Sequence, residues 1–237
     1  LNSLLEQISG VYEIKQSRIG PAPTDQKAVR ILSRVLQWTD FGLEWEADQR
    51  HSELITRHCN LGDKSKAVST PGEKREFEDR EGSPDLTHEE AFRFRAIVAR
   101  GNYLAQDRTD VQYAVKELSR RMSAPKECDW TSAKRLGRSL ANKTRSVLHF
   151  GHQELWTGVT VWSDTDFAGC RDERKSTSGG VIMFGGRCLK SWSLTQKVIA
   201  LSSGEAEYYG LVKSGSQGLG IRALLGDLGV ERTVVLN

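Results

Sequence analysis

Two pairs of acidic residues in the last third of the chain constrain its fold more than any other feature. Asp164 and Asp166 directly follow a short apolar run at residues 159–162, which predicts a strand that ends at the first of them. Further along, Glu205 and Glu207 lie in the first turns of a predicted helix. A rigid strand and a rigid helix can aim carboxylates at one point, and Mg²⁺ takes such oxygen ligands. The pattern therefore predicts an α/β domain with a site for a divalent cation.

Strand and turn signals surround the first acidic pair. Residues 146–150 predict a strand, and residues 151–157 predict a loop that leads into the last domain. Residues 180–184 and 189–192 are apolar runs on either side of a glycine pair at 185–186. Because glycine pairs favour tight hairpin turns, these two runs are expected to form neighbouring antiparallel strands.

The helix that carries the second acidic pair has a clear start and an ambiguous middle. Ser202 and Glu205 have the S-x-x-E spacing of a capping box, which predicts the helix start. Gly215, Gly218 and Gly220 interrupt the helical spacing, and glycine costs up to about 1 kcal/mol against alanine inside a helix. The helix is therefore expected to break at these glycines. A phosphate-binding loop is the alternative, although the spacing fits no known loop well.

The middle of the chain predicts three helices. Thr87 is a candidate N-cap, and acidic residues follow it in the first turn, where the helix dipole favours them. Apolar residues then recur at helical spacing to about Leu104, and again over about residues 110–122 and 129–140. This part of the chain is therefore expected to be mainly helical.

The first part of the chain predicts a β-hairpin followed by a helix. Alternating apolar residues at 29–38 and 43–47 flank an Asp/Gly turn, and residues 49–60 follow as a predicted helix. The spacing of three potential zinc ligands on that helix fits no usual finger: His51, His58 and Cys59. Residues 72–85 are dense in charge and nearly free of apolar side chains, which predicts a solvated linker. A partner-binding tail is the alternative for that segment.

Basic residues outnumber acidic ones between residues 116 and 145. A set of cations on one surface neutralises phosphates and gives affinity that does not depend on sequence, whereas the alternative is an ordinary solvated helix face. The basic residues of this segment are Lys116, Arg120, Arg121, Lys126, Lys134, Arg135, Arg138, Lys143 and Arg145. As a set, they favour a nucleic-acid-binding surface.

Composition and charge limit the classes of protein to which the chain can belong. The net charge of +3 permits nucleic-acid binding without requiring it. The four cysteines form no C-x-x-C pair, which favours reduced cysteines in an intracellular protein of the cytoplasm or nucleus, not a secreted one. No run of about eighteen apolar residues is present, so no membrane association is expected.

Four blocks in the last third carry a family resemblance. They are residues 162–169 (WSDTDFAG), 172–180 (DERKSTSGG), 191–197 (SWSLTQK) and 200–208 (ALSSGEAEY). In order and spacing these blocks resemble the ribonuclease H domain of copia-type LTR retrotransposon polyproteins. The resemblance implies a ribonuclease H-like mixed sheet with helices. It also implies that Asp164 and Glu207 are catalytic ligands of Mg²⁺, with Mn²⁺ as a substitute. The family's third acid is expected at the end of a strand that residues 233–237 resemble, and it is absent from the sequence.

The earlier parts resemble the same polyproteins. Residues 68–71 (VSTP) are similar to a turn behind the reverse-transcriptase palm, and residues 103–136 are similar to the helical thumb and connection. The implied fold class is α/β (α+β), with a palm hairpin fragment before the helical segment. The implied domains are the palm end (1–71), a charged linker (72–86), the thumb/connection (87–150) and a ribonuclease H domain truncated before its third acid (151–237).

The resemblance implies two-metal hydrolysis of the RNA strand of an RNA–DNA hybrid. The partners implied are this hybrid or a duplex, and other parts of the same polyprotein. The residues expected to contact nucleic acid are Lys116, Arg120, Arg121, Lys134, Arg135, Arg138, Lys143 and Ser176. The alternative is a degenerate remnant that binds nucleic acid without catalysis. No polymerase Asp-Asp pair occurs and the later ribonuclease H acids are absent, so this chain alone is expected to be inactive.

Overall fold

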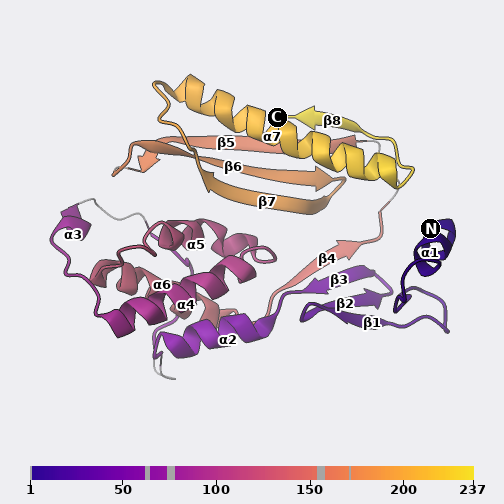
Figure 1. The fold of residues 1–237 in the computed structure, drawn as a ribbon, viewed down its shortest axis with the longest axis horizontal. Helices are drawn as coiled ribbons and strands as arrows, with labels where there is room; N and C mark the ends of the chain where they lie inside the picture. The colour runs from indigo at the N-terminus through magenta and orange to yellow at the C-terminus, as the bar shows by residue number, and fades with distance from the viewer. Residues whose placement is uncertain (1, 62–64, 74–77, 154–157, 171) are drawn as a thin grey trace. The chain divides into compact units, whose positions relative to one another are not determined.

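A computed structural model describes residues 2–61, 65–73, 78–153, 158–170 and 172–237. The fold is mixed α/β with two four-stranded sheets, as the sequence predicts in outline (Figure 1). The chain falls into two compact units, Leu1–Glu46 with Val147–His152, and Ala47–Ser146 with Gln153–Asn237. Parts of the predicted linker (residues 74–77) and of the predicted loop before the last domain (residues 154–157) lie outside the described residues.

The first unit is an antiparallel sheet preceded by a short helix. Helix α1 spans Asn2–Ser9. The sheet has the order β1-β2-β3-β4, and its strands are β1 (Ala28–Ile31), β2 (Arg34–Thr39), β3 (Gly42–Glu46) and β4 (Val147–Gly151). The predicted strand near residues 146–150 is thus confirmed, and it pairs with β3.

The predicted hairpin of this unit is confirmed, with one correction. Strands β2 and β3 pair from Val35–Glu46 to Thr39–Gly42, around the predicted turn. Residues 29–38, predicted as one strand, instead form two strands, because Leu32 and Ser33 adopt positive φ angles of 49° and 68°. Paired left-handed residues make the tight turn whose twist suits a hairpin, so β1 folds back on β2.

The helices between residues 49 and 142 begin and end close to where the sequence predicts, except for a short helix in the predicted linker, which the sequence does not predict. They are α2 (Gln49–His58), α3 (Glu78–Glu81), α4 (His88–Leu104), the 3₁₀ turn η1 (Thr109–Val111), α5 (Gln112–Ser119) and α6 (Glu127–Asn142). Thr87 caps α4 through a capping box with Glu90: its hydroxyl accepts from the Glu90 amide at 3.3 Å, and the Glu90 carboxylate accepts from the Thr87 amide at 3.1 Å. These bonds satisfy amide donors that a helix start otherwise leaves free.

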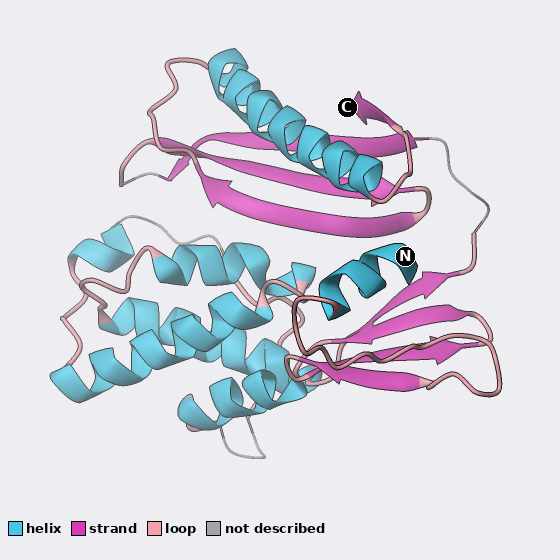
Figure 2. Ribbon diagram, turned by 45° about the vertical axis from the view of Figure 1, so that its right-hand side comes forward, coloured by secondary structure: helices cyan, strands magenta, loops and turns pink. Residues whose placement is uncertain are grey.

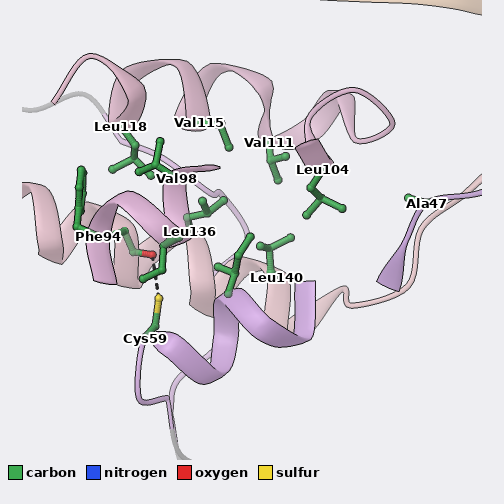
Figure 3. Close-up of a cluster of buried hydrophobic side chains, with 13 residues drawn as sticks. Ala47, Cys59, Phe94, Val98, Leu104, Val111, Val115, Leu118, Leu136 and Leu140 are labelled. Atoms are coloured by element: carbon green, nitrogen blue, oxygen red, sulfur yellow. Dashed lines mark hydrogen bonds between the residues drawn. The ribbon is translucent and has the colours of Figure 1, made fainter. Parts of the chain in front are cut away.

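Large apolar side chains fill the space between these helices (Figure 3). Helix α2 packs against α4 and α6, and α5 packs against the same two helices. Phe94, Ile97 and Leu136 are fully buried there. The Cys59 thiol lies in the same core and donates a weak hydrogen bond to the Ala133 carbonyl, at 3.5 Å. We call this group of helices the bundle.

The second sheet has the order β7-β6-β5-β8. Strand β6 (Lys175–Phe184) pairs antiparallel with both β5 (Gly158–Cys170) and β7 (Arg187–Thr195), and β8 (Thr233–Leu236) runs parallel to β5. The predicted hairpin at the glycine pair is confirmed, with Gly185 at a φ of 59°. Helix α7 (Ser203–Asp227) lies along one face of this sheet (Figures 1 and 2).

Helix α7 corrects one prediction from the sequence. It runs unbroken through Gly215, Gly218 and Gly220, where a break was expected. The reason is packing, because a Cβ atom at Gly218 would lie 2.8 Å from Val234 Cγ1 and 2.9 Å from Val161 Cγ2. Glycine lets the helix approach the sheet closely, and this contact outweighs its low helix propensity.

Part of the segment predicted to be a solvated linker is structured. The segment contains helix α3, and the Arg80 guanidinium of this helix donates to the Ala124 carbonyl at 2.9 Å. The Leu86 amide donates to the Pro125 carbonyl at 3.1 Å. These bonds tie the described end of the segment to the start of α6. Among all described helices, none combines the length and the apolar character that crossing a membrane requires.

Candidate functional site

Asp164 lies within strand β5, near the residues that pair with β8. The prediction that the strand ends at this residue is wrong, because β5 continues to Cys170. Its parallel pairing with β8, however, stops at Val161 and Leu236. Just beyond, the Asn237 amide donates to the Val161 carbonyl at 2.8 Å, and the Ser163 amide donates to the Asn237 carbonyl at 2.9 Å. Asp164 follows Ser163 on β5 and pairs with Gly179 of β6, and its side chain is exposed.

Glu207 lies near the start of α7, just beyond the cap. The Ser202 hydroxyl accepts from the Glu205 amide at 3.1 Å, which confirms the first half of the predicted capping box. The Glu205 carboxylate accepts from the Leu201 amide at 2.7 Å, so the second bond goes one residue earlier than predicted. The cap uses Glu205 and leaves Glu207 exposed.

Small residues bring α7 against β5 beside Asp164. The Ser214 hydroxyl donates to the Ser163 hydroxyl at 2.8 Å. A Cβ atom at Gly210 would lie 2.3 Å from Thr165 Oγ1. The two residues that flank Asp164 along the strand thus both contact α7. Glu207 precedes Gly210 by about one turn, so its backbone lies near this contact. Because side chains alternate along a strand, Asp164 points to the face of the sheet opposite the one that Ser163 and Thr165 present to α7.

The second half of β5 bends sharply around Ser176. The pairing with β6 shifts register between Asp166 and Cys170, and Ala168 adopts a φ of 51°. The Ser176 hydroxyl is fully buried and accepts from the Ala168 amide at 3.1 Å. Ser176 therefore supports the bend in this structure, and its predicted contact with nucleic acid stays a prediction. Asp166 is exposed on the strand.

The carboxylates fit a hard cation only with help from other ligands. Asp164 and Glu207 supply exposed oxygen donors, and Mg²⁺ often takes only one or two carboxylates, with water and phosphate completing its shell. Within the described residues, no group of three or more His, Cys, Asp or Glu side chains is placed to hold a metal ion. A cation at this site would therefore depend on this pair and on bound substrate.

Three of the predicted basic residues lie against the second sheet. The Lys116 ammonium is 2.5 Å from the Glu117 carboxylate and donates to the Thr177 hydroxyl at 2.9 Å. Arg120 and Arg121 pair with carboxylates in the turn between β5 and β6. Burial opposes the charged form of Arg120, but hydrogen bonding to Cys170 and the nearby Glu117 carboxylate raise its pKa overall. These three cations are largely engaged within the chain.

The other predicted basic residues lie on or near α6. Arg135 pairs with Glu73 at 2.8 Å, and Arg138 is half-buried. Lys134 is exposed, with its ammonium 6.0 Å from the Trp130 ring centre. Lys143 follows the last residue of α6 and is also exposed. The structure thus leaves Lys134 and Lys143 as the accessible members of the predicted set.

The sequence prediction missed the partners of the engaged arginines. Asp172 and Glu173 belong to one of the four family blocks, but they were not identified as partners of α5. The only sequence signal was their charge, which does not specify a partner some fifty positions away. Pairing of this kind follows from the fold and not from local sequence.

Comparisons with known proteins give relatives of more than one kind, and Pol polyproteins are prominent among them. No model of a known protein family matches the chain. The chain is 34% identical over 138 residues to a retrovirus-related Pol polyprotein from transposon RE2 of Arabidopsis thaliana, which covers 58% of this chain and 9% of that protein. It is 33% identical over 126 residues to the Pol polyprotein from transposon TNT 1-94 of Nicotiana tabacum, covering 53% and 9%.

A shorter relative also matches. The chain is 36% identical over 104 residues to secreted RxLR effector protein 161 of Plasmopara viticola, which covers 44% of this chain and 72% of that protein. The chain matches only about a tenth of the length of the Pol polyproteins.

Proposed function

Because this chain belongs to the family of retrovirus-related Pol polyproteins from copia-type transposons, we propose that its last third is a ribonuclease H domain that acts on RNA–DNA hybrids. The observation that carries the proposal is the placement of Asp164 and Glu207. Both carboxylates are exposed, and they belong to β5 and α7, two elements that are in contact. The helical and hairpin segments before them are proposed to be the thumb/connection and the end of a reverse-transcriptase palm.

The strand arrangement supports the ribonuclease H assignment. Three antiparallel strands are extended by the parallel β8, and a long helix packs on β5, β6 and β8. In the domain that the chain resembles, β5 corresponds to the first strand, α7 to the first helix and β8 to the fourth strand. The backbone hydrogen bonds of Asn237 with Val161 and Ser163 place the end of β8 directly beside the Asp164 region.

The residues of the site would act by positioning substrate and holding charge. Asp164 and Glu207 would hold Mg²⁺, which when bound activates water and stabilises the leaving oxygen of a phosphodiester. The contacts of Ser163 and Thr165 with α7 fix the position of α7 on β5, the two elements that carry Glu207 and Asp164. The exposed ammonium groups of Lys134 and Lys143 would neutralise phosphates of the duplex.

A cleavage assay with matched carboxylate variants tests the proposal. The chain, in its longest natural form, is incubated with a labelled RNA–DNA hybrid and Mg²⁺, beside the same protein with Asp164→Asn, Glu207→Gln or the neighbouring control change Asp166→Asn. Loss of a ligand should reduce cleavage by at least about 100-fold, because even the loss of groups that only support metal ligands costs 10–100-fold. The control should cleave nearly as well as the unaltered chain. Equal effects of all three changes would count against the assignment of Asp164 and Glu207.

One observation favours a second candidate function, which is hybrid binding without catalysis. In the described part of the chain, no third His, Cys, Asp or Glu joins this carboxylate pair in a metal-binding group. Two carboxylates hold Mg²⁺ weakly and orient water poorly. If the unaltered chain binds the hybrid but cleaves it with neither Mg²⁺ nor Mn²⁺, the binding function is the better account.

A further inference from the structure

One face of α5 contacts the second sheet along its whole length. Gln112, Lys116 and Arg120 are spaced four residues apart, so they form a stripe on one side of the helix. At one end, the Gln112 amide donates to the Ser191 carbonyl at 3.3 Å, and the Ser191 hydroxyl donates back to Gln112 at 3.0 Å. In the middle, Lys116 donates to the Thr177 hydroxyl of β6.

At the other end of the stripe, Arg120 and the next residue, Arg121, pair with carboxylates in the turn between β5 and β6. The Arg121 guanidinium lies 2.6 Å from the Asp172 carboxylate, and each of these side chains is 21% exposed. The Arg120 guanidinium lies 3.2 Å from both Glu117 and Glu173, and its side chain is 14% exposed. The pKa of Glu173 is lowered, first by Lys175 and then by Arg120. These arginines thus lie between carboxylates of their own chain, largely away from solvent.

We propose that this stripe is a docking seam and that Lys116, Arg120 and Arg121 are positioning residues, not ligands of nucleic-acid phosphates. The seam fixes the β5–β6 turn, and with it the strand that carries Asp164, against α5. A phosphate that recruited Arg121 would have to displace Asp172 and leave that carboxylate unpaired. Breaking a partly buried pair in this way removes much of what the new interaction would gain.

The seam limits which basic residues can contact the phosphates of a duplex. Lys134 and Lys143 are exposed and, among the described residues, form no salt bridge, although each acts at longer range on one carboxylate, Glu90 and Asp110 respectively. They can contact phosphates at no cost to an internal pair. The inference therefore separates the engaged cations Lys116, Arg120 and Arg121, on and just after α5, from the exposed lysines, Lys134 on α6 and Lys143 just after it. Only the second part rests on the proposed function.

Hydrogen exchange tests the docking function without nucleic acid. The variants are Arg121→Asp, Asp172→Arg and the double variant that carries both changes. Each single change should speed amide exchange in the β5–β6 turn by about fivefold, and the double variant should restore protection. Exchange within α4 and α6 serves as the internal check that each variant is folded. Unchanged exchange of the turn in all three proteins would overturn the seam.

Salt dependence of hybrid binding tests the division of the basic residues. The slope of log affinity against log salt falls by about 0.9 for each duplex phosphate that the protein no longer neutralises. Lys134→Gln should reduce the slope by about that amount, whereas Arg120→Gln and Arg121→Gln should leave it unchanged. The opposite pattern would identify the arginines as phosphate ligands and overturn the proposal. Absence of hybrid binding in every protein, with the exchange results as expected, would overturn the proposed function but not the seam.

Discussion

The bundle and the second sheet solve the same packing problem in different ways. In the bundle, large side chains such as Phe94, Ile97 and Leu136 fill the space between helices. Between α7 and the sheet, the buried positions of the helix are Ala206, Gly210, Ser214 and Gly218. Large side chains therefore fill the core of the bundle, whereas small residues let the backbone of α7 lie close to β5.

This difference explains where the candidate site lies. Large apolar side chains form the core of the bundle, and its helices also bury a few polar side chains, among them Ser52 and Ser139. Close approach needs only small groups, so neighbouring positions on α7 and β5 remain available for exposed polar side chains. Asp164 and Glu207 occupy such positions, beside the contacts of Gly210 and Ser214. The chemistry is thus expected in the less apolar of the two regions, and the stability in the other.

The largest expected effect tests the stability of the bundle. Phe94→Ala removes a fully buried ring and should lower the free energy of unfolding by about 3–5 kcal/mol, because it leaves a cavity. Urea denaturation measures the change. Phe92, two residues away on α4, is 67% exposed, so Phe92→Ala should change stability by less than about 0.5 kcal/mol. Similar losses in both variants would show that the bundle is not packed as described.

The next effect uses pH to probe the same core. Burial raises the pKa of the Cys59 thiol to about 12, against about 8.5 for an unperturbed thiol. The unfolded chain therefore loses this proton first as pH rises. The stabilising contribution is complete below about pH 8.5 and is lost progressively up to about pH 12.

Between pH 8 and pH 10 this group should lower the free energy of unfolding by about 2 kcal/mol. Urea denaturation at the two pH values measures the loss. The loss should be smaller by that amount in Cys59→Ala and unchanged in Cys128→Ala, which leaves the buried thiol in place. A pH dependence that is identical in all three proteins would show that Cys59 is not buried as described.

Local signals in the sequence predicted most elements of both regions. The caps at Thr87 and Ser202 and the turn at Gly185 are each set by a few neighbouring residues, and the structure confirms their positions. The mixed α/β class follows from the same local periodicities. The resemblance implies that Asp164 and Glu207 act together; the structure shows contact between β5 and α7, and the shared site stays a prediction.

Features that depend on distant residues were not predictable. The pairing of Arg121 with Asp172 joins positions about fifty residues apart, so no local pattern specifies it. The continuity of α7 through its glycines has the same origin. The helix propensity of Gly218 argues for a break, but its contacts with Val161 and Val234 come from strands distant in the sequence. In both cases tertiary packing outweighs the local preference.

The smallest expected effect separates these two influences on α7. At Gly220 a Cβ atom would meet nothing within 4 Å, so Gly220→Ala should stabilise the chain by about 0.5–1 kcal/mol through helix propensity alone. Gly218→Ala gains the same propensity but forces the new methyl against two valines, and overpacking costs about 1–3 kcal/mol. Its net effect should therefore be a loss of about 1 kcal/mol.

Urea denaturation of the two variants shows whether helix propensity or close packing on β5 dominates at each position. Opposite signs would show that close approach to β5 keeps Gly218 small. Stabilisation by both changes would mean that α7 does not pack tightly on the sheet. The contrast between volume packing in the bundle and close approach at α7 would then no longer hold, and the shared placement of Asp164 and Glu207 would lose its structural support.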